Sequence, residues 1–229
     1  MKQFNGLVKE TTSMAVYRNL TELLLSGYFE PGEWIRERQV KDLLGISSTP
    51  IREAMRMLVH EDILESIPHH GVRIRRLTEK EIRDYYEFRA ELEGLAAELA
   101  AERGTDSDFD KINQLLVNTE QLIRNGAVKE DTKFIKYNNK FHSLIAQAGQ
   151  NHVLVHSLEQ IQTKINMLRV YSWYKEDKRR PTKTLTQHQQ IFDAIKERNP
   201  KLARKKIQEH VLNRLEHELE MEEIYANKK

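Results

Sequence analysis

The chain has 229 residues, enough for one or two ordinary domains, and it contains no cysteine, which excludes disulfides, thiolate metal sites and thiol catalysis. Charged residues make up 31% of the chain but sum to a net charge of only +2, so total charge alone does not indicate a nucleic-acid-binding protein. The apolar runs are too short to cross a membrane and the N-terminus lacks an apolar signal segment, so we expect a soluble, cytoplasmic protein without a membrane partner.

The first third of the chain is predicted to form short helices and strands. Apolar residues recur at helical spacing from Met14 to Ser26, and Gly27 ends this predicted helix. A second short helix is predicted at about Arg38–Leu44, and Gly45 is a suitable C-terminal stop for it.

A third predicted helix has a buried side and an exposed side. Either Ser47 or Thr49 can cap its start, and Pro50 is tolerated in its first turn. The apolar residues that would face a core are Ile51, Ala54, Met55 and Leu58. The residues left on the solvent side are Ser48, Thr49, Arg52 and Arg56. Their hydroxyl and guanidinium groups suit base edges and phosphates, so this helix is a candidate DNA-reading element.

Two short strands are predicted after this helix. They cover Ile63–Ile67 and Val72–Arg76 and flank the turn Pro68-His69-His70-Gly71. Three helices followed by such a hairpin predict a winged helix-turn-helix domain at residues 1–76.

Residues 78–229 show helical spacing throughout and no strand-like alternation. Thr78 and Glu81 predict a capping box at the start of this region. The predicted helices span about 78–103, 107–125, 129–148, 151–173, 182–198 and 201–224. The chain is therefore predicted to be mainly α, with a winged helix-turn-helix followed by an all-α helical bundle.

Both halves resemble the GntR family of bacterial transcription regulators. In the first half the resemblance is carried by Gly32, the Arg38–Leu44 helix, the run Gly45–Ala54 and the wing pair His70-Gly71. The second half resembles the FCD effector domain of the FadR subfamily. The matching residues there are Arg89–Glu93, Asn138, Phe141-His142, Asn151, His188, Ile191, Ala194-Ile195 and His210. The resemblance implies a DNA-binding domain followed by an effector-binding and dimerisation domain.

The resemblance also implies which residues approach the operator. They are Arg38, Ser47, Ser48, Thr49, Arg52, His70 and Gly71. Ser48 departs from the family, which usually has an arginine at this position. Because an arginine bidentate to guanine contributes about 1–3 kcal/mol of base discrimination, we expect an operator, or an operator affinity, that differs from the family's usual one.

Three histidines are aligned with apolar helical faces: His142, His188 and His210. Each needs a partner if buried, because an unpaired buried polar group costs roughly 1–3 kcal/mol. For any one of them a bond to a backbone carbonyl is the ordinary alternative, but three in the family's positions favour a shared divalent metal, zinc or nickel. Asn138, one turn before His142, could add an oxygen ligand. Aspartate is frequent there in metal-binding members, so the neutral amide should weaken metal binding or leave more positive charge for an anion.

Arg89 shares a helical face with Tyr85, Leu92 and Ala96, so its guanidinium is expected to point into the bundle and to need an anion. The simple partner is Glu93, four residues further on. The FCD resemblance implies a functional partner instead, the carboxylate of a small organic acid held between Arg89 and the metal.

These features predict a ligand-responsive transcription regulator, with repression as its expected action. A homodimer is expected because one recognition helix contacts too few base pairs, and a two-fold protein reads a palindromic operator. The alternative is a metal-dependent hydrolase with a DNA-binding appendage, since a three-histidine site can activate water. The chain carries no His-Glu-x-x-His motif, phosphate loop or nucleophile elbow, so we expect no enzyme.

Overall fold

The computed structural model describes residues 12–25, 28–30, 32–126, 132–173 and 180–226. The chain divides into two compact units, residues 1–77 and 78–229, and each is considered by itself. Two details of the predicted helices lie outside the described residues. These are the end of the first helix at Ser26 and Gly27, and the first residues, 129–131, of the helix predicted over 129–148.

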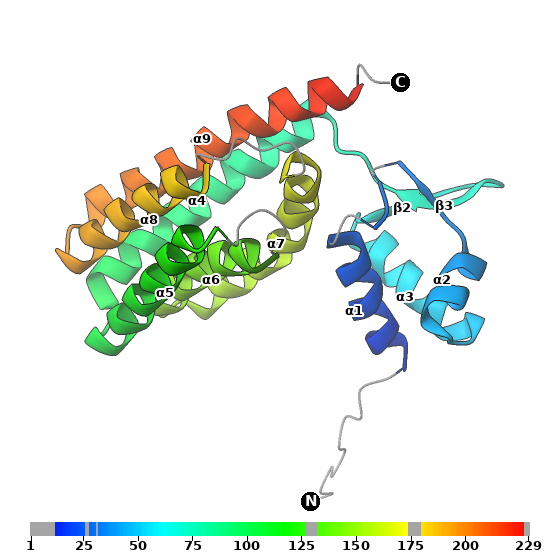
Figure 1. The fold of residues 1–229 in the computed structure, drawn as a ribbon, viewed down its shortest axis with the longest axis horizontal. Coiled ribbons are helices and arrows are strands. Elements are labelled where there is room, and N and C mark those ends of the chain that lie inside the picture. Colours follow the sequence, from blue (N-terminus) through cyan, green and yellow to red (C-terminus); the bar gives the residue numbers. More distant parts are fainter. Residues whose placement is uncertain (1–11, 26–27, 31, 127–131, 174–179, 227–229) are drawn as a thin grey trace, which may run out of the picture. The chain divides into compact units, whose positions relative to one another are not determined.

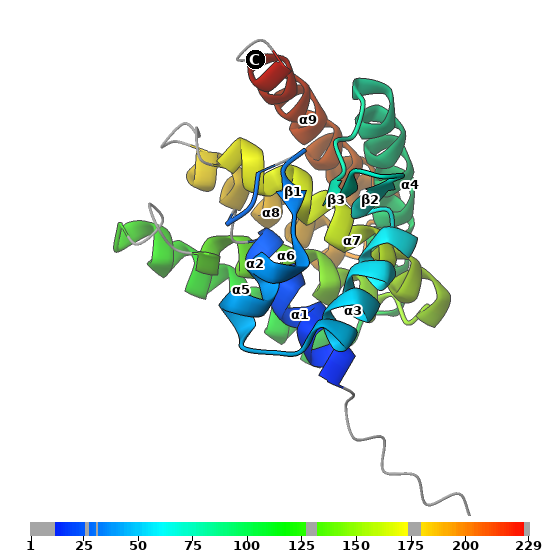
Figure 2. The same cartoon turned by 90° about the vertical axis from the view of Figure 1, so that its right-hand side faces the viewer.

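The first unit is a winged helix-turn-helix, as predicted (Figure 1). Its helices are α1 (Thr12–Leu25), α2 (Glu37–Leu44) and α3 (Ser48–His60). Its strands are β1 (Trp34–Ile35), β2 (Leu64–Ile67) and β3 (Gly71–Ile74), arranged side by side in the order β1-β3-β2 (Figure 2). The core between them is apolar and includes Val16, Leu20, Val40, Ile51, Leu58 and Ile74, all fully buried.

The sheet has one strand more than the predicted hairpin. β1 pairs antiparallel with β3, with Trp34 opposite Arg73 and Ile35 opposite Val72. A strand of two residues is too short to produce a recognisable alternation of apolar and polar side chains, and this is why the sequence pattern missed it. Its effect is to attach the segment before α2 to the wing.

The turn between α2 and α3 follows from two residues. Gly45 ends α2 in the left-handed conformation, at φ 67°, and its N–H donates to the carbonyl of Lys41 at 2.8 Å. Ser47 then occupies the N-cap position of α3 with an extended backbone, but its side chain makes no capping hydrogen bond. The hydroxyl of Ser47 therefore does not cap the start of α3.

The second unit is helical in all of its described segments and contains no strand there, which agrees with the predicted all-α bundle (Figure 1). Its helices are α4 (Glu79–Arg103), α5 (Asp106–Arg124), α6 (Thr132–Ala148), α7 (His152–Trp173), α8 (Arg180–Lys196) and α9 (Pro200–Ala226). The predicted capping box is present, because the Thr78 side chain accepts from the N–H of Glu81 and the Glu81 carboxylate accepts from the N–H of Thr78. No helix among the described residues is long and apolar enough to cross a membrane.

Helix α4 forms much of the bundle's core, with small residues on its inner faces. Gly94 allows close approach, because an added Cβ there would lie only 3.0 Å from the side chain of Gln208 on α9. Arg204 of α9 donates to Glu91 at 2.6 Å and to Glu98 at 2.8 Å, both on α4. This packing of α4 against α9 brings the inward-facing residues of both helices into the same interior.

Candidate functional site

The predicted operator contacts lie on the surface of the first unit. All of them are exposed except Ser48, which is half-buried at the start of α3. Arg38 lies on α2, and its Nε is 3.9 Å from the carboxylate of Asp42. Arg52 on α3 is more firmly held, because its Nε donates to Glu37 Oε1 at 2.7 Å.

A hollow of about 650 Å³ lies between α3, the wing and the segment around β1. It brings together three of the predicted contacts, Arg52, His70 and Gly71, whereas Arg38 and residues 47–49 do not line it. Arg56, which the sequence placed on the exposed face of the same helix as Arg52, also lines it, as does Arg36, which was not predicted. The hollow thus gathers three guanidinium groups and one imidazole around a single acid, Glu37.

Trp34 forms an aromatic part of the lining of this hollow. Its ring centroid lies 6.2 Å from that of His70 in the wing turn, and Arg73 of β3 lies over it at 5.5 Å. Arg73 is in turn bonded to Glu65 of β2 at 2.7 Å. β1 therefore contributes directly to the position of the wing residue His70.

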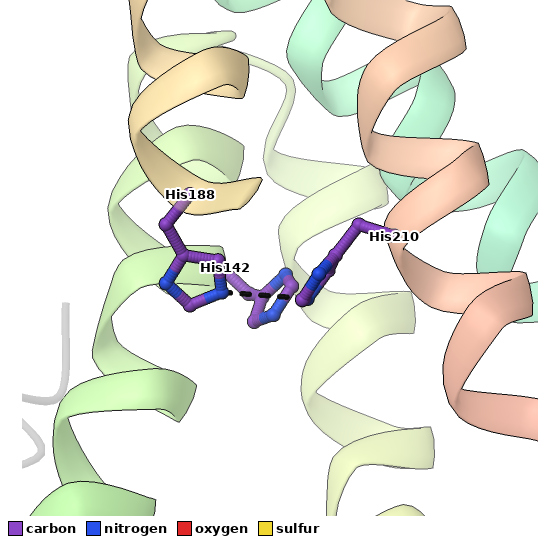
Figure 3. Close-up of side chains that lie close together, drawn as sticks. All are labelled: His142, His188 and His210. Carbon is purple, nitrogen blue, oxygen red and sulfur yellow. Dashed lines mark hydrogen bonds between the residues drawn. The ribbon is translucent and has the colours of Figure 1, made fainter. Parts of the chain in front are cut away.

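In the second unit, three buried histidines from three helices converge (Figure 3). His142 lies on α6, His188 on α8 and His210 on α9, and one ring nitrogen of each lies within 4.8 Å of those of the other two. The Nε2 atoms of His188 and His210 are 3.3 Å apart. Two nitrogens bound tetrahedrally to one zinc ion, each at about 2.0–2.1 Å, would be about 3.4 Å apart. The three imidazoles therefore have the donor type that suits a divalent metal, and the His188–His210 pair also has the spacing.

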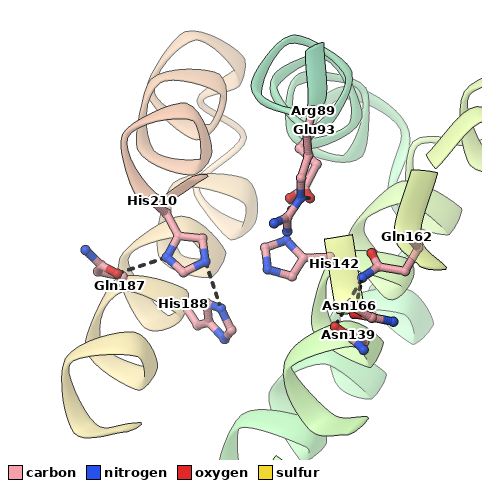
Figure 4. Close-up of polar contacts among 9 residues, drawn as sticks. All are labelled: Arg89, Glu93, Asn139, His142, Gln162, Asn166, Gln187, His188 and His210. Carbon is pink, nitrogen blue, oxygen red and sulfur yellow. Dashed lines mark hydrogen bonds and ion pairs between the residues drawn. The ribbon is translucent and has the colours of Figure 1, made fainter. Parts of the chain in front are cut away.

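Two further side chains orient the histidines. The Oε1 atom of Gln187 lies 2.9 Å from His210 Nδ1, and the carboxylate of Glu93 contacts His142 Nδ1 (Figure 4). A ring nitrogen that donates its hydrogen to such an oxygen leaves the other nitrogen, Nε2, with a lone pair for a metal. His188 is fixed in a different way, because Phe141 stacks on its ring with centroids 3.9 Å apart.

Asn138 lies one turn before His142 on α6 and is half-buried. The amide next to it, Asn139, accepts a hydrogen bond from Gln162 at 3.3 Å, and Gln162 also donates to Asn166 at 2.7 Å (Figure 4). The role of Asn138 as an oxygen ligand stays a prediction.

Arg89 is buried, at 1% exposure, and extends from α4 together with Glu93 toward His142 (Figure 4). Its Nε donates to Glu93 Oε1 at 2.5 Å, so the simple partner foreseen from the sequence is present. Its Nη1 and Nη2 atoms are buried and have no hydrogen-bond partner among the described residues. A buried guanidinium with two unused donor nitrogens is suited to an anion.

Glu93 is a carboxylate shared between two partners, the guanidinium of Arg89 and the imidazole of His142. Burial alone would raise the pKa of Glu93, but the charge of Arg89, together with the contact with His142, outweighs the burial and holds that pKa well below the usual range of a carboxyl. Glu93 is therefore an anion in the folded protein. Its contact with His142 joins α4 to α6, and sequence spacing carries no signal for a contact between two helices.

Two segments of the chain match known protein families. Residues 12–74 match the description "Bacterial regulatory proteins, gntR family", and residues 84–213, more than half of the chain, match the FCD domain. The chain belongs to the GntR family and carries an FCD domain.

This GntR-family protein is 35% identical to YdhC, an uncharacterised HTH-type transcriptional regulator of Bacillus subtilis, over 89% of this chain and 88% of that protein. It is 30% identical to the Nta operon transcriptional regulator of Aminobacter aminovorans, over 66% of this chain and 70% of that protein. The solved structure of E. coli McbR/YncC shares its fold, with a TM-score of 0.79, 21% identity and coverage of 94% and 99% of the two chains. These matches agree with the prediction of a regulator rather than an enzyme.

The arginines that line the hollow of this GntR-family protein lead to a prediction about how DNA binding depends on salt concentration. We expect Arg36→Ala and Arg56→Ala each to weaken binding to random-sequence duplex DNA and to reduce the slope of log K against log[salt] by about 0.9, the value for one lost phosphate contact. Fluorescence anisotropy at several salt concentrations measures this slope. Arg124→Ala, which removes an exposed arginine from α5, is the control and should leave the slope unchanged. Slopes equal to the wild-type value in both hollow variants would exclude these two residues from phosphate contact.

Proposed function

We propose that the protein is a homodimeric repressor that binds a palindromic operator in the cytoplasm and responds to a small organic acid through a metal-containing FCD domain. The family supports DNA binding and regulation of transcription. The remaining parts of the proposal rest on the residues of the two units.

The observation that supports the effector proposal is the buried, incompletely hydrogen-bonded guanidinium of Arg89. Its guanidinium is buried and uses only Nε on Glu93, while Nη1 and Nη2 have no hydrogen-bond partner in the described part of the chain. Leaving charged donors unsatisfied in a protein interior costs free energy, typically 1–3 kcal/mol or more for each group. The carboxylate of a small organic acid would satisfy both nitrogens at once, because its two oxygens match the guanidinium edge.

The proposed metal site consists of His142, His188 and His210, with Asn138 as a further oxygen ligand. Imidazole nitrogens suit zinc or nickel, and three of them leave at least one coordination position for another oxygen. When bound, the metal would supply a second positive charge for the carboxylate of the effector. Because Asn138 is neutral, the ligand set itself adds no negative charge that would oppose an anion.

The dimer proposal is supported by exposed apolar side chains on the packed helices α4 and α9. Phe88 is 51% exposed and Leu212 is 41% exposed. Burial of such side chains against a second copy would remove apolar surface from water, and a two-fold arrangement would present two recognition helices to a palindrome. In the dimer, effector binding would favour the arrangement of the two DNA-binding domains that fits the operator less well.

The proposed function is tested with a labelled DNA fragment from upstream of the protein's own gene. Fluorescence anisotropy should show tight, salt-dependent binding that is at least about tenfold stronger than to a shuffled fragment. A library of small carboxylates, screened by thermal shift with Zn²⁺ present, should contain a compound that both raises the melting temperature and weakens operator binding. Equal affinity for the native and shuffled fragments would contradict the regulator proposal, and tighter operator binding with the compound would contradict repression.

A further inference from the structure

Glu93 of α4 contacts one residue of each proposed binding site. Its Oε1 accepts from Arg89 Nε at 2.5 Å, and its Oε2 contacts His142 Nδ1 on α6. The side chain is 3% exposed, so water does not compete effectively for either oxygen. A change in the strength of one contact must therefore change the strength of the other, because both use the same carboxylate.

The contact with His142 determines which ring nitrogen is available to a metal. With Nδ1 donating its hydrogen to Glu93, Nε2 carries the lone pair, and this orientation is the one that favours metal binding. A cation on Nε2 also draws electron density from the ring, which makes Nδ1–H a stronger donor. His142 would then hold the carboxylate of Glu93 more tightly.

The contact with Arg89 determines which edge of the guanidinium is available to an anion. Nε is occupied by Glu93, so the remaining pair is Nη1 and Nη2, which have no hydrogen-bond partner within the residues described. If His142 holds Glu93 more tightly, less of the carboxylate's negative charge compensates Arg89. The guanidinium then offers more uncompensated positive charge to an incoming anion.

We infer that Glu93 is a positioning residue that couples the three-histidine site to the anion site at Arg89, so that a metal and a carboxylate each raise the protein's affinity for the other. The inference rests on the proposed function and adds to it a defined route between its two ligands. By linkage the two enhancements must be equal, and coupling of this kind is typically about 5–150-fold.

The test uses the full chain with Co²⁺ and acetate as probes. Calorimetry gives the affinity for each probe with and without the other, and the visible d–d absorption of Co²⁺ reports the coordination geometry. In the wild type, saturating acetate should tighten Co²⁺ binding at least about fivefold, and Co²⁺ should tighten acetate binding by the same factor.

Glu93→Gln is the decisive variant. An amide keeps only one of the two oxygens that now face Arg89 and His142, and its NH2 group would present a donor to the other nitrogen in place of an acceptor. We expect Co²⁺ binding to weaken by about 10–100-fold, as for other lost partners of metal-bound histidines, and the mutual enhancement by acetate to fall below about twofold. Glu98→Gln is the matched control on the same helix, since Glu98 pairs with Arg204 of α9, and it should behave as the wild type.

A second variant tests the route from the other end and does not require Glu93→Gln to fold. Arg89 reaches His142 through Glu93, so Arg89→Gln should shift Co²⁺ affinity several-fold and should do so only while Glu93 is present. In a double-mutant cycle the two substitutions should be non-additive. Unchanged Co²⁺ affinity in Arg89→Gln, or wild-type coupling in Glu93→Gln, would overturn the inference while leaving the proposed function intact. A wild type that binds neither probe would overturn both.

Discussion

Replacing His142, His188 and His210 together with glutamine is expected to reduce bound divalent metal from roughly one ion per chain to none, since a three-histidine site of this kind holds a single ion. Glutamine fills similar space, so the core keeps its volume while the imidazole lone pairs are lost. Elemental analysis of protein purified without chelators measures the effect. In the wild type, metal at about 100 times its dissociation constant should stabilise the effector domain by about 2.7 kcal/mol, which the triple variant should not show.

The control for this experiment is His156→Gln on α7. His156 is exposed and its ring contacts Gln160 at 3.1 Å, so its loss should change neither metal content nor the metal-induced stabilisation. Single glutamine variants of the three histidines should each weaken binding, because all three nitrogens lie within reach of one ion. Equal metal content in the wild type and the triple variant would show that these three histidines do not form the metal site.

Replacing Arg89 with methionine is expected to abolish the response to a carboxylate effector and to destabilise the second unit. The substitution removes the guanidinium that would hold the anion and leaves Glu93 as a buried charge. Breaking a buried ion pair typically costs about 3–5 kcal/mol, and we expect the lower end of this range because Glu93 keeps His142 as a partner. Denaturant unfolding measures the stability, and thermal shift with carboxylates measures the response.

Arg83→Met on the same helix is the matched control for this substitution. Arg83 pairs with Glu79 at the same four-residue spacing, at 2.7 Å, but both side chains are exposed. An exposed pair of this kind contributes at most about 0.5 kcal/mol, so the stability should hardly change. The double variant Arg89→Met/Glu93→Leu removes both buried charges and should recover stability without recovering the effector response. An effector response that persists in Arg89→Met would place the anion site elsewhere.

The fold could be predicted largely because its signals are local. Gly45 and Ser47 mark the turn before α3, and the capping box of Thr78 and Glu81 marks the start of the bundle within a few residues. β1 was missed because a two-residue strand is defined only by its pairing with β3. Its pairing creates one wall of the basic hollow, so Arg36 and Arg56 could not be grouped with His70 beforehand.

For the candidate metal and anion residues, too, the features within one helix could be predicted from the sequence and the contacts between helices could not. His142, His188 and His210 could be proposed because each follows the apolar face of its own helix and because all three stand in positions that the FCD resemblance implies. Arg89 could be paired with Glu93 by helical spacing. The contacts of Glu93 with His142 and of Gln187 with His210 join residues on different helices. Such contacts depend on how the helices pack, which the spacing of residues within one helix does not report.

The ion pair between Arg52 and Glu37 has a consequence for how operators are told apart. The Arg52 side chain is 61% exposed, so its bond to Glu37 is inexpensive to break, but Arg52 must give up one partner to gain another on DNA. A passing phosphate offers little more than Glu37 already provides, whereas a guanine edge offers two aligned acceptors. The cost of breaking the bond to Glu37 is the same for either partner, so only a contact stronger than that bond would release Arg52. In the proposed complex, Arg52 would therefore stay paired with Glu37 on unrelated DNA and would turn to a base edge only at a matching site.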